Sequence, residues 1–495
     1  MAAGPVVMRE TLRTRMGWLH AWVGFLCGLV LVCICATGTL AVFDTEITRW
    51  MQPEIDIPAN ASLTDTALDA AAARVREQQA RGIFAFLNLP SARAPMLEVL
   101  HYNGHEFTGD VLDPRTGAPI AARATAGGKF FYDFHYTLRG GGTVGVGIVN
   151  ALAFGLLISV GAGIVIHLRA LLPDIVMLRL SGSRLRSWLD AHLLGGVLFL
   201  PFIVMMAYTG ILIHADTILP ARLPALVEAP KAPAAPPARP PVPPLPMVAH
   251  LRPLLETARK NLGGRECGFI LFSPDRLSIS ASDASGPFLT RDHVDFALPD
   301  GHVLGTTLTR RPIATTLQLM HGLHYARFAP PALRWLYFIS GLGATATIAS
   351  GLILFLMKRR RQSGHLRVFR IAEGLNIATI TGLPVGILSF LWANRMLPAG
   401  MAGRDMLEIT VFLAIWAACA VHGISRSCRT FPMRGWREQL AVIMVLGCGL
   451  PLLDLVSGMA AWLHAPGLHA GIGGMAFLCG LAAFHASARI GGEPR

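Results

Sequence analysis

Charged residues are scarce in this chain of 495 residues: Asp, Glu, Lys and Arg make up 15% of it, against 53% hydrophobic residues. The mean hydropathy is +0.50. This balance is unusual for a soluble protein and typical of an integral membrane protein. Common nucleotide and metal motifs are also missing, because the sequence has no Walker loop, no G-x-G-x-x-G after a strand, no H-E-x-x-H and no C-x-x-C. The sequence therefore does not indicate an enzyme that binds its own nucleotide.

Cysteine is sparse outside the apolar runs. Seven of the eight cysteines lie in those runs or in a short loop between them, and Cys267 alone falls in a long polar segment. No disulfide framework is therefore expected. We interpret the cysteines of the apolar runs as small buried hydrophobic residues.

Eight apolar runs are long enough to cross a bilayer, which takes about 20 helical residues. They cover 20–43, 143–167, 193–214, 335–357, 375–394, 406–424, 440–462 and 468–487. The predicted fold is thus a mainly α-helical polytopic membrane protein. Its parts are 1–43 (tail and first span), 44–142 (first outer domain), 143–214 (second and third spans), 215–334 (proline-rich linker and second outer domain), 335–357 (fourth span) and 358–495 (four further spans).

Arginine and lysine mark the cytoplasmic side of short loops. They cluster around Arg13, Arg184 and Arg359, whereas the short loops on the opposite side hold only Arg395 and Arg404. With eight spans, both termini are predicted to be cytoplasmic. The net charge of +13 follows from this topology, so it does not support nucleic-acid binding.

The two long outer segments each predict a small α+β domain. The first has a helical stretch at 64–81, strand-like runs at 96–102 and 109–112, and a turn at 113–117. The second begins with a stiff proline-rich spacer. Its predicted elements are the spacer at 230–246, a helix at 251–262, strands at 268–273, 276–281 and 292–298, and a turn at 299–302.

A short pattern occurs twice and places histidines at matched positions. His20 and His192 each precede a Thr-Gly pair, with eighteen residues from histidine to glycine in both copies. His135 and His324 each stand before a tyrosine and ahead of the next apolar run. Residues 10–170 and 180–360 therefore read as a parallel duplication of helix, domain and helix.

Histidines inside a membrane are costly and usually functional. In a parallel repeat, His20 would face His192 near the inner leaflet, and His135 would face His324 near the outer one. Paired imidazoles of this kind are the ligands of a bis-histidine haem. The roughly 28 residues from His135 to Gly163 would cover about 42 Å as a helix, so the pattern predicts two haem b groups. His167 lies at the inner depth and is an alternative to His20 or His192.

Two arginines follow the outer histidines closely. Arg139 and Arg327 would lie about one helical turn beyond His135 and His324 if those segments are helical. A guanidinium suits a haem propionate or an anionic iron chelate. We expect a docking cleft between the two outer domains with both arginines at its floor. Phe131, Tyr132 and Tyr325 are expected beside the outer ligands.

The remaining membrane histidines have no counterpart in the repeat. His214 and His321 are therefore interpreted as structural, and those of the last four spans as interfacial. Asp454 is different, because a carboxyl within a span is costly and could mark a proton or quinone site.

At these motifs the chain resembles the PepSY-associated transmembrane helix family. The motifs that carry the resemblance are Arg13–His20, Thr37–Leu40, Trp50–Glu54, Arg186–His192, Leu323–Phe328 and Arg334–Tyr337. The resemblance implies a bacterial inner-membrane protein with PepSY-like periplasmic domains, and for some members haem-dependent reduction of ferric siderophores. The chain departs from the family pattern at Ala329-Pro330-Pro331, and the last four spans extend beyond the minimal unit.

Three functions are compatible with these features. The first is a di-haem reductase that passes electrons from a quinol or a separate reductase to a periplasmic ferric siderophore or related iron chelate. The second is a siderophore or iron transporter, which unpaired polar residues within the membrane, away from the histidines, would favour. The third is a non-catalytic PepSY protein that regulates or docks a partner.

Overall fold

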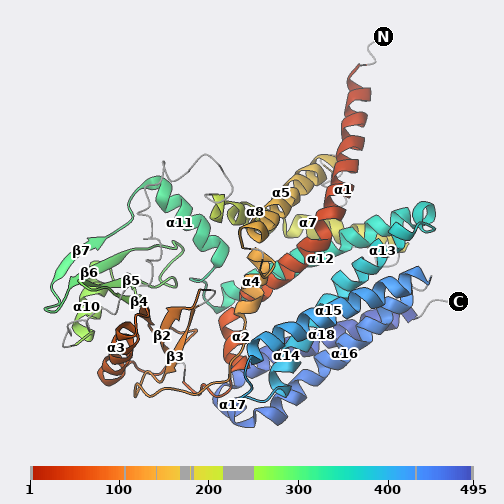
Figure 1. Ribbon diagram of the computed structural model, residues 1–495. Helices are drawn as coiled ribbons and strands as arrows, with labels where there is room; N and C mark the ends of the chain where they lie inside the picture. The colour runs from red at the N-terminus through yellow and green to blue at the C-terminus, as the bar shows by residue number, and fades with distance from the viewer. Residues whose placement is uncertain are drawn as a thin grey trace. The chain divides into compact units, whose positions relative to one another are not determined.

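The computed structural model of the protein (Figure 1) describes most of the chain. The described residues are 4–58, 60–104, 107–140, 142–167, 179, 183–215, 250–429 and 432–491, with side chains from residue 12 onward. They fall into two compact units. We call residues 1–51, 124–218 and 331–495 the membrane unit, and residues 52–123 and 219–330 the sheet unit.

The membrane unit is built from long apolar helices. Among the described residues, seven helical segments are long and apolar enough to cross a bilayer, and a bent helix pair makes an eighth. The polytopic membrane architecture predicted from the sequence is therefore present. The segments are α1 (Gly4–Ala41), α5 (Gly142–His167), α7 with α8 (Arg184–Leu198 and Leu200–Ile213), α12 (Pro331–Ser363), α13 to α14 (Arg367–Met396), α15 (Arg404–Cys428), α16 (Pro432–Ser457) and α18 (Pro466–Gly491).

The third span is bent rather than straight. Helices α7 and α8 meet at Phe199 with an angle of 63° between them. Pro201 explains the break, because proline has no N–H to donate to the preceding turn and its ring clashes with the carbonyl four residues earlier. The single helix expected over 193–214 is thus two helices.

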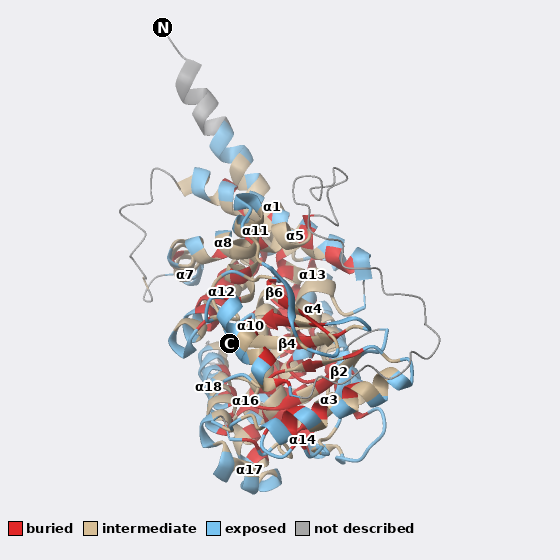
Figure 2. Cartoon of the chain, turned by 90° about the vertical axis from the view of Figure 1, so that its left-hand side faces the viewer, coloured by how far each residue is buried: buried red, intermediate tan, exposed pale blue. Residues whose placement is uncertain are grey.

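Packing divides the membrane unit into two groups of helices. Helix α1 packs against α5 and α12, α12 packs against α7, and α5 packs against α8. The second group follows residue 366: α13 (Arg367–Ile377), a π-helical turn η2 (Ala378–Gly382) and α14 (Leu383–Met396) form one span beside α15, and α16 pairs with α18. Figure 2 shows much of α16 and α18 as exposed, as expected for helices that face lipid.

Among the described residues, three short helices complete the membrane unit. They are α2 (Asp44–Met51), α4 (Lys129–Thr137) and α17 (Met459–His464). Because α16 ends at Ser457, the expected seventh span over 440–462 stops earlier than predicted, and α17 follows as a separate turn of helix. Helices α2 and α4 flank the chain segment that belongs to the sheet unit.

The sheet unit contains one antiparallel sheet from two parts of the chain. Its order, among the described residues, is β3-β2-β1-β4-β5-β6-β7. The strands are β1 (Ala85–Asn88), β2 (Leu97–Tyr102), β3 (Phe107–Leu112), β4 (Cys267–Phe272), β5 (Arg276–Ala281), β6 (His293–Ala297) and β7 (Val303–Thr307). Helices α3 (Asp65–Ala80), α10 (Arg252–Asn261) and α11 (Pro312–Tyr325) accompany them.

The two outer segments do not form separate domains, which corrects the sequence prediction. Strands β1 and β4 pair antiparallel, with Leu87 opposite Ile270 at the middle of the register. Both side chains are fully buried in one core that α3 and α10 share. Each half is a helix followed by an antiparallel meander. A three- or four-stranded half gains a second hydrogen-bonded neighbour and a larger core by joining the other.

Most predicted elements of the sheet unit are present. Helix α3 begins at the Thr64 N-cap, whose hydroxyl accepts a hydrogen bond from the Ala67 N–H at 3.1 Å. The turn after β3 closes with Gly117 at φ +73°, a backbone conformation that glycine favours. The edge strand β7, the short strand β1, and helices α4 and α11 were not predicted. The proline-rich spacer at 230–246 lies outside the described residues.

Candidate functional site

His20 and His192 face each other within the membrane unit. Their ring centroids lie 6.0 Å apart with 68° between the ring planes. His20 Nδ1 donates a hydrogen bond to the Ser159 carbonyl oxygen at 2.8 Å, and His192 Nδ1 donates to the Thr347 carbonyl oxygen at 2.9 Å. A carbonyl oxygen can only accept, so each Nδ1 carries the ring proton and each Nε2 keeps its lone pair. The pair is thus prepared to bind a metal through Nε2.

Glycines allow the two imidazoles to lie close to neighbouring helices. A methyl group on Gly163 of α5 would come within 3.1 Å of His20 Cε1, and one on Gly351 of α12 would come within 3.0 Å of His192 Cε1. The carbonyl acceptor stands four residues before the glycine in both places. Each histidine therefore packs against its neighbouring helix through the same two features, a carbonyl acceptor and a glycine four residues after it.

His167 lies at the end of α5, near this pair but outside its ring contact. It interacts electrostatically with both His20 and His192. His20 and His192, by contrast, are each hydrogen-bonded to a backbone carbonyl, and their rings face each other. The sequence left His167 as a replacement for either, and the observed ring contact favours the original pairing.

His135 lies on α4 and is held in the same manner. Its Nδ1 donates to the Ile34 carbonyl oxygen of α1 at 2.8 Å, and a methyl group on Gly38 would come within 2.5 Å of that nitrogen. His214, which ends α8, stacks on the neighbouring Tyr136 with ring centroids 6.0 Å apart and 6° between planes. It also interacts electrostatically with His135. His214, interpreted from the sequence as merely structural, is therefore a neighbour of a candidate ligand.

His324 belongs to the other unit. It lies near the end of α11 in the sheet unit, whereas His135 lies in the membrane unit. The structure brings His20 and His192 together and describes His135 and His324 in separate units.

The arginines beyond these histidines do not follow a continuing helix, which corrects the expected spacing. Helix α4 ends at Thr137, and both Leu138 and Arg139 have positive φ. Arg139 lies over the Phe130 ring at 5.8 Å. Helix α11 likewise ends before Ala326 at φ +50°, so Arg327 is also beyond a left-handed C-cap.

The expected docking cleft was placed between two separate outer domains, whereas β1 and β4 join the two segments edge to edge in one sheet. Phe131 also differs from its expected place beside a cleft. It is 1% exposed and its ring packs on Phe390 of α14 at 5.4 Å. Tyr132 and Tyr325 neighbour the histidine segments, with Tyr132 packed on Tyr136 and Tyr325 on His324.

Buried polar clusters in the last spans were largely missed by sequence reasoning. Asp454 accepts hydrogen bonds from the indole N–H groups of Trp50 and Trp462 at 3.0 Å each, and it pairs with Arg395 at 2.6 Å. His469, expected at an interface, is 1% exposed and bonds Asp454 at 2.8 Å. The sequence signal for these clusters is the presence of ionisable residues inside apolar runs, and Asp454 was the one residue interpreted in this way.

These observations define a polytopic membrane protein with an inserted sheet unit and a facing pair of histidines between its first helices. The family model for the PepSY-associated TM region matches residues 17–358. The chain belongs to this family. No curated protein matches the chain. The matched region contains all four repeated histidines and leaves residues 359–495 outside.

Proposed function

We propose that the protein is a di-haem b membrane oxidoreductase that reduces a ferric siderophore or a related iron chelate. The observation that carries this proposal is the facing pair His20 and His192, with both Nδ1 atoms anchored to backbone carbonyls. Histidines inside a membrane are more costly than apolar residues there. A role as metal ligands accounts for two histidines that face each other, each with a defined tautomer.

The spacing of the pair fits axial ligation. Two metal–imidazole bonds of about 2 Å, with about 1 Å from each nitrogen to its ring centroid, give about 6 Å between centroids. The observed separation is 6.0 Å. The residues present therefore suit a bis-histidine haem, which His20 and His192 would hold through their Nε2 atoms. A b-type haem bound here would supply one-electron transfer.

Matched contacts support an internal duplication and hence a second site. Thr37 Oγ1 donates to the Cys33 and Ile34 carbonyls, and Thr209 Oγ1, 172 residues later, donates to the Met205 and Met206 carbonyls. The two halves of the sheet also resemble each other, because β1 to β3 follow helix α3 and β4 to β7 follow helix α10. Within this duplication we propose His135 and His324 as the ligands of the second haem, with Arg139 and Arg327 available to the propionates.

The proposed direction of electron flow follows from the distribution of charge. The basic loops support a cytoplasmic location for both termini, and in a bacterial inner membrane the sheet unit would then be periplasmic. The His20 and His192 pair then lies toward the electron donor, a quinol or a separate reductase. The His135 and His324 pair lies toward the iron chelate. Arg395 and Asp454 of the last spans are paired with each other at 2.6 Å, so this pair does not supply the unpaired polar residues that would favour a transporter.

A reduced-minus-oxidised optical spectrum of the purified protein tests this proposal directly. We expect b-type bands and two haems per chain. Replacing His20 or His192 by alanine should lower the content toward one, whereas replacing His167 should leave it at two. A fully loaded preparation without b-type bands would refute the proposal, and loss of haem from the His167 variant would reassign the inner ligand.

A further inference from the structure

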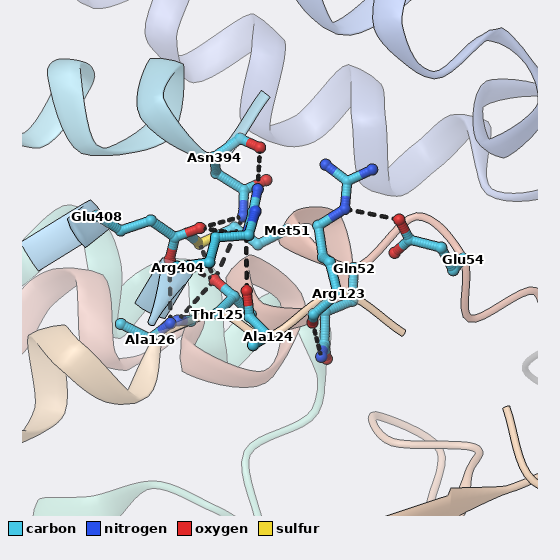
Figure 3. Close-up of polar contacts among 11 residues, drawn as sticks. Met51, Gln52, Glu54, Arg123, Ala124, Thr125, Ala126, Asn394, Arg404 and Glu408 are labelled. Atoms are coloured by element: carbon cyan, nitrogen blue, oxygen red, sulfur yellow. Dashed lines mark hydrogen bonds and ion pairs between the residues drawn. The ribbon is translucent and has the colours of Figure 1, made fainter. Parts of the chain in front are cut away.

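The spans after residue 358 make specific contacts with the matched family region. Arg404 of α15 donates to the Ala124 carbonyl oxygen at 2.7 Å, and Glu408 accepts from the Ala126 N–H at 3.0 Å. Figure 3 shows these side chains reaching the 124–126 segment. That segment leads directly into α4, which carries His135. The contacts are to backbone groups, so they fix the path of the chain.

The charged pair that makes these contacts is fully buried. Arg404 and Glu408 are both 0% exposed and lie 2.5 Å apart. Asn394 of α14 donates to Glu408 at 2.7 Å, and the Thr125 hydroxyl donates to the other carboxylate oxygen at 2.7 Å. A buried ion pair is weak evidence for stability, since apolar residues of similar size often serve as well. Its bonds to residues 124–126 suggest a role in placing that segment.

Aromatic packing holds α4 along its length. Phe130 packs on Phe390 and Phe412 with ring centroids 5.0 Å away in both contacts. Phe134 packs on Phe412 at 5.9 Å and on Trp416 at 6.0 Å. His135 follows Phe134 and reaches α1 through its Nδ1. Helix α4 is therefore held by α1 at its histidine and by α14 and α15 at its phenylalanines.

A second cluster fixes the other side of the insertion. Arg395 donates to the Trp50 carbonyl oxygen at 2.7 Å and lies over its indole ring at 4.0 Å. Asp454 accepts from the Trp50 indole N–H. Trp50 lies in the last turn of α2, and α2 is tied to α4 because the Gly128 N–H donates to the Thr48 hydroxyl at 2.9 Å. Residues of α14 and α15 therefore bond the chain on both sides of the inserted residues 52–123, at Trp50 before them and at residues 124–126 after them.

We infer that the C-terminal extension, residues 359–495, is a positioning scaffold for His135. It sets the place of α4 through the Arg404–Glu408–Thr125 cluster and the aromatic contacts, while α1 orients the imidazole. The inference rests on the proposed haem function for its spectroscopic consequence. Its structural consequence, the order of α4, does not depend on haem.

The main test replaces Arg404 and Glu408 together by methionine, which removes both charges and keeps α15 apolar. We expect haem content to fall from two toward one per chain, with loss of the same haem that His135→Ala removes. Amide exchange in α4, residues 129–137, should rise at least tenfold. The matched control is Arg426→Met with Glu438→Met, because that pair also joins side chains of this extension at 2.6 Å, near the other end of α15. It should retain both haems and normal exchange in α4.

A milder variant separates positioning from loss of folding. Thr125→Val removes the hydroxyl that bonds Glu408, and Thr125→Ser restores it. We expect a shifted reduction potential for the haem at His135 in the valine variant and a normal potential in the serine variant. If Arg404 and Glu408 can be replaced without a change in α4 exchange, or if Thr125→Val matches Thr125→Ser in potential and exchange, the inference is wrong. Raised exchange in α4 in a protein without haem would instead refute only the proposed function.

Discussion

The imidazoles of His20 and His192 are related by contact and by the way each is anchored. Each ring donates from Nδ1 to a carbonyl on a different neighbouring helix, Ser159 on α5 and Thr347 on α12. The ring centroids lie 6.0 Å apart. The anchors fix both tautomers, so both Nε2 lone pairs can serve as ligands. Because Gly163 and Gly351 lie against these two rings, substitutions at the glycines also test the arrangement.

Alanine at Gly163 or Gly351 should disturb the inner haem. The added methyl would lie about 3 Å from an imidazole carbon, closer than ordinary packing allows. Such overpacking costs typically about 1–3 kcal/mol, and here it acts on the ligand. We expect a shifted reduction potential or partial loss of one haem, measured by redox titration. Gly161→Ala is the control, because a methyl there meets nothing within 4 Å. Equal effects of Gly161→Ala and Gly163→Ala would contradict the proposed contact.

The partner of His135 can be decided by two substitutions. The proposed duplication predicts that His324→Ala removes the outer haem, lowering the content from two toward one. His214 is the rival, because it stacks on Tyr136 and interacts with His135. If His214→Ala removes a haem and His324→Ala does not, the second site is built within the membrane unit alone. Haem per chain in the two purified variants gives the answer.

The shared sheet predicts that both outer halves unfold together. Ile270 is fully buried opposite Leu87, so Ile270→Asp places a charge in the common core. We expect a loss of about 4 kcal/mol or more. Limited proteolysis should then cleave residues 60–104 and 250–330 at similar rates. Leu304→Asp on β7, where the side chain is 53% exposed, is the control and should change stability by about 0.5 kcal/mol or less. Cleavage of 250–330 alone would show that the halves are independent.

Cys267 should react slowly with thiol reagents at neutral pH. Burial raises the pKa of its thiol to about 11, and the thiol donates to the Leu255 carbonyl at 3.7 Å. Because only the thiolate reacts, about one molecule in a thousand is reactive at pH 8. In a variant retaining Cys267 alone, the maleimide labelling rate should rise about tenfold per pH unit toward pH 11. Denaturation at pH 7 should accelerate labelling. A rate that levels off near pH 9 would show an ordinary thiol pKa.

The sequence by itself determined the membrane class, the spans and the candidate ligands. Long apolar runs leave few alternatives to spanning helices, since backbone polar groups in lipid must bond internally. The matched spacing of His20 and His192 was also visible, because repeated residues remain recognisable at a constant offset. The helical stretch predicted from residue 64 likewise agrees with the start of α3 at Asp65.

Only the tertiary structure decided how distant segments meet. The pairing of β1 with β4 joins two segments far apart in sequence, and no local pattern indicates which edge strands will pair. From the sequence, Arg404 was only a residue of a short loop, yet it and Glu408 bond the backbone of Ala124 and Ala126. Likewise, the left-handed residues after α4 and α11 redirect Arg139 and Arg327 away from helical spacing. These contacts depend on the packing of whole helices and strands, which sequence periodicity does not encode.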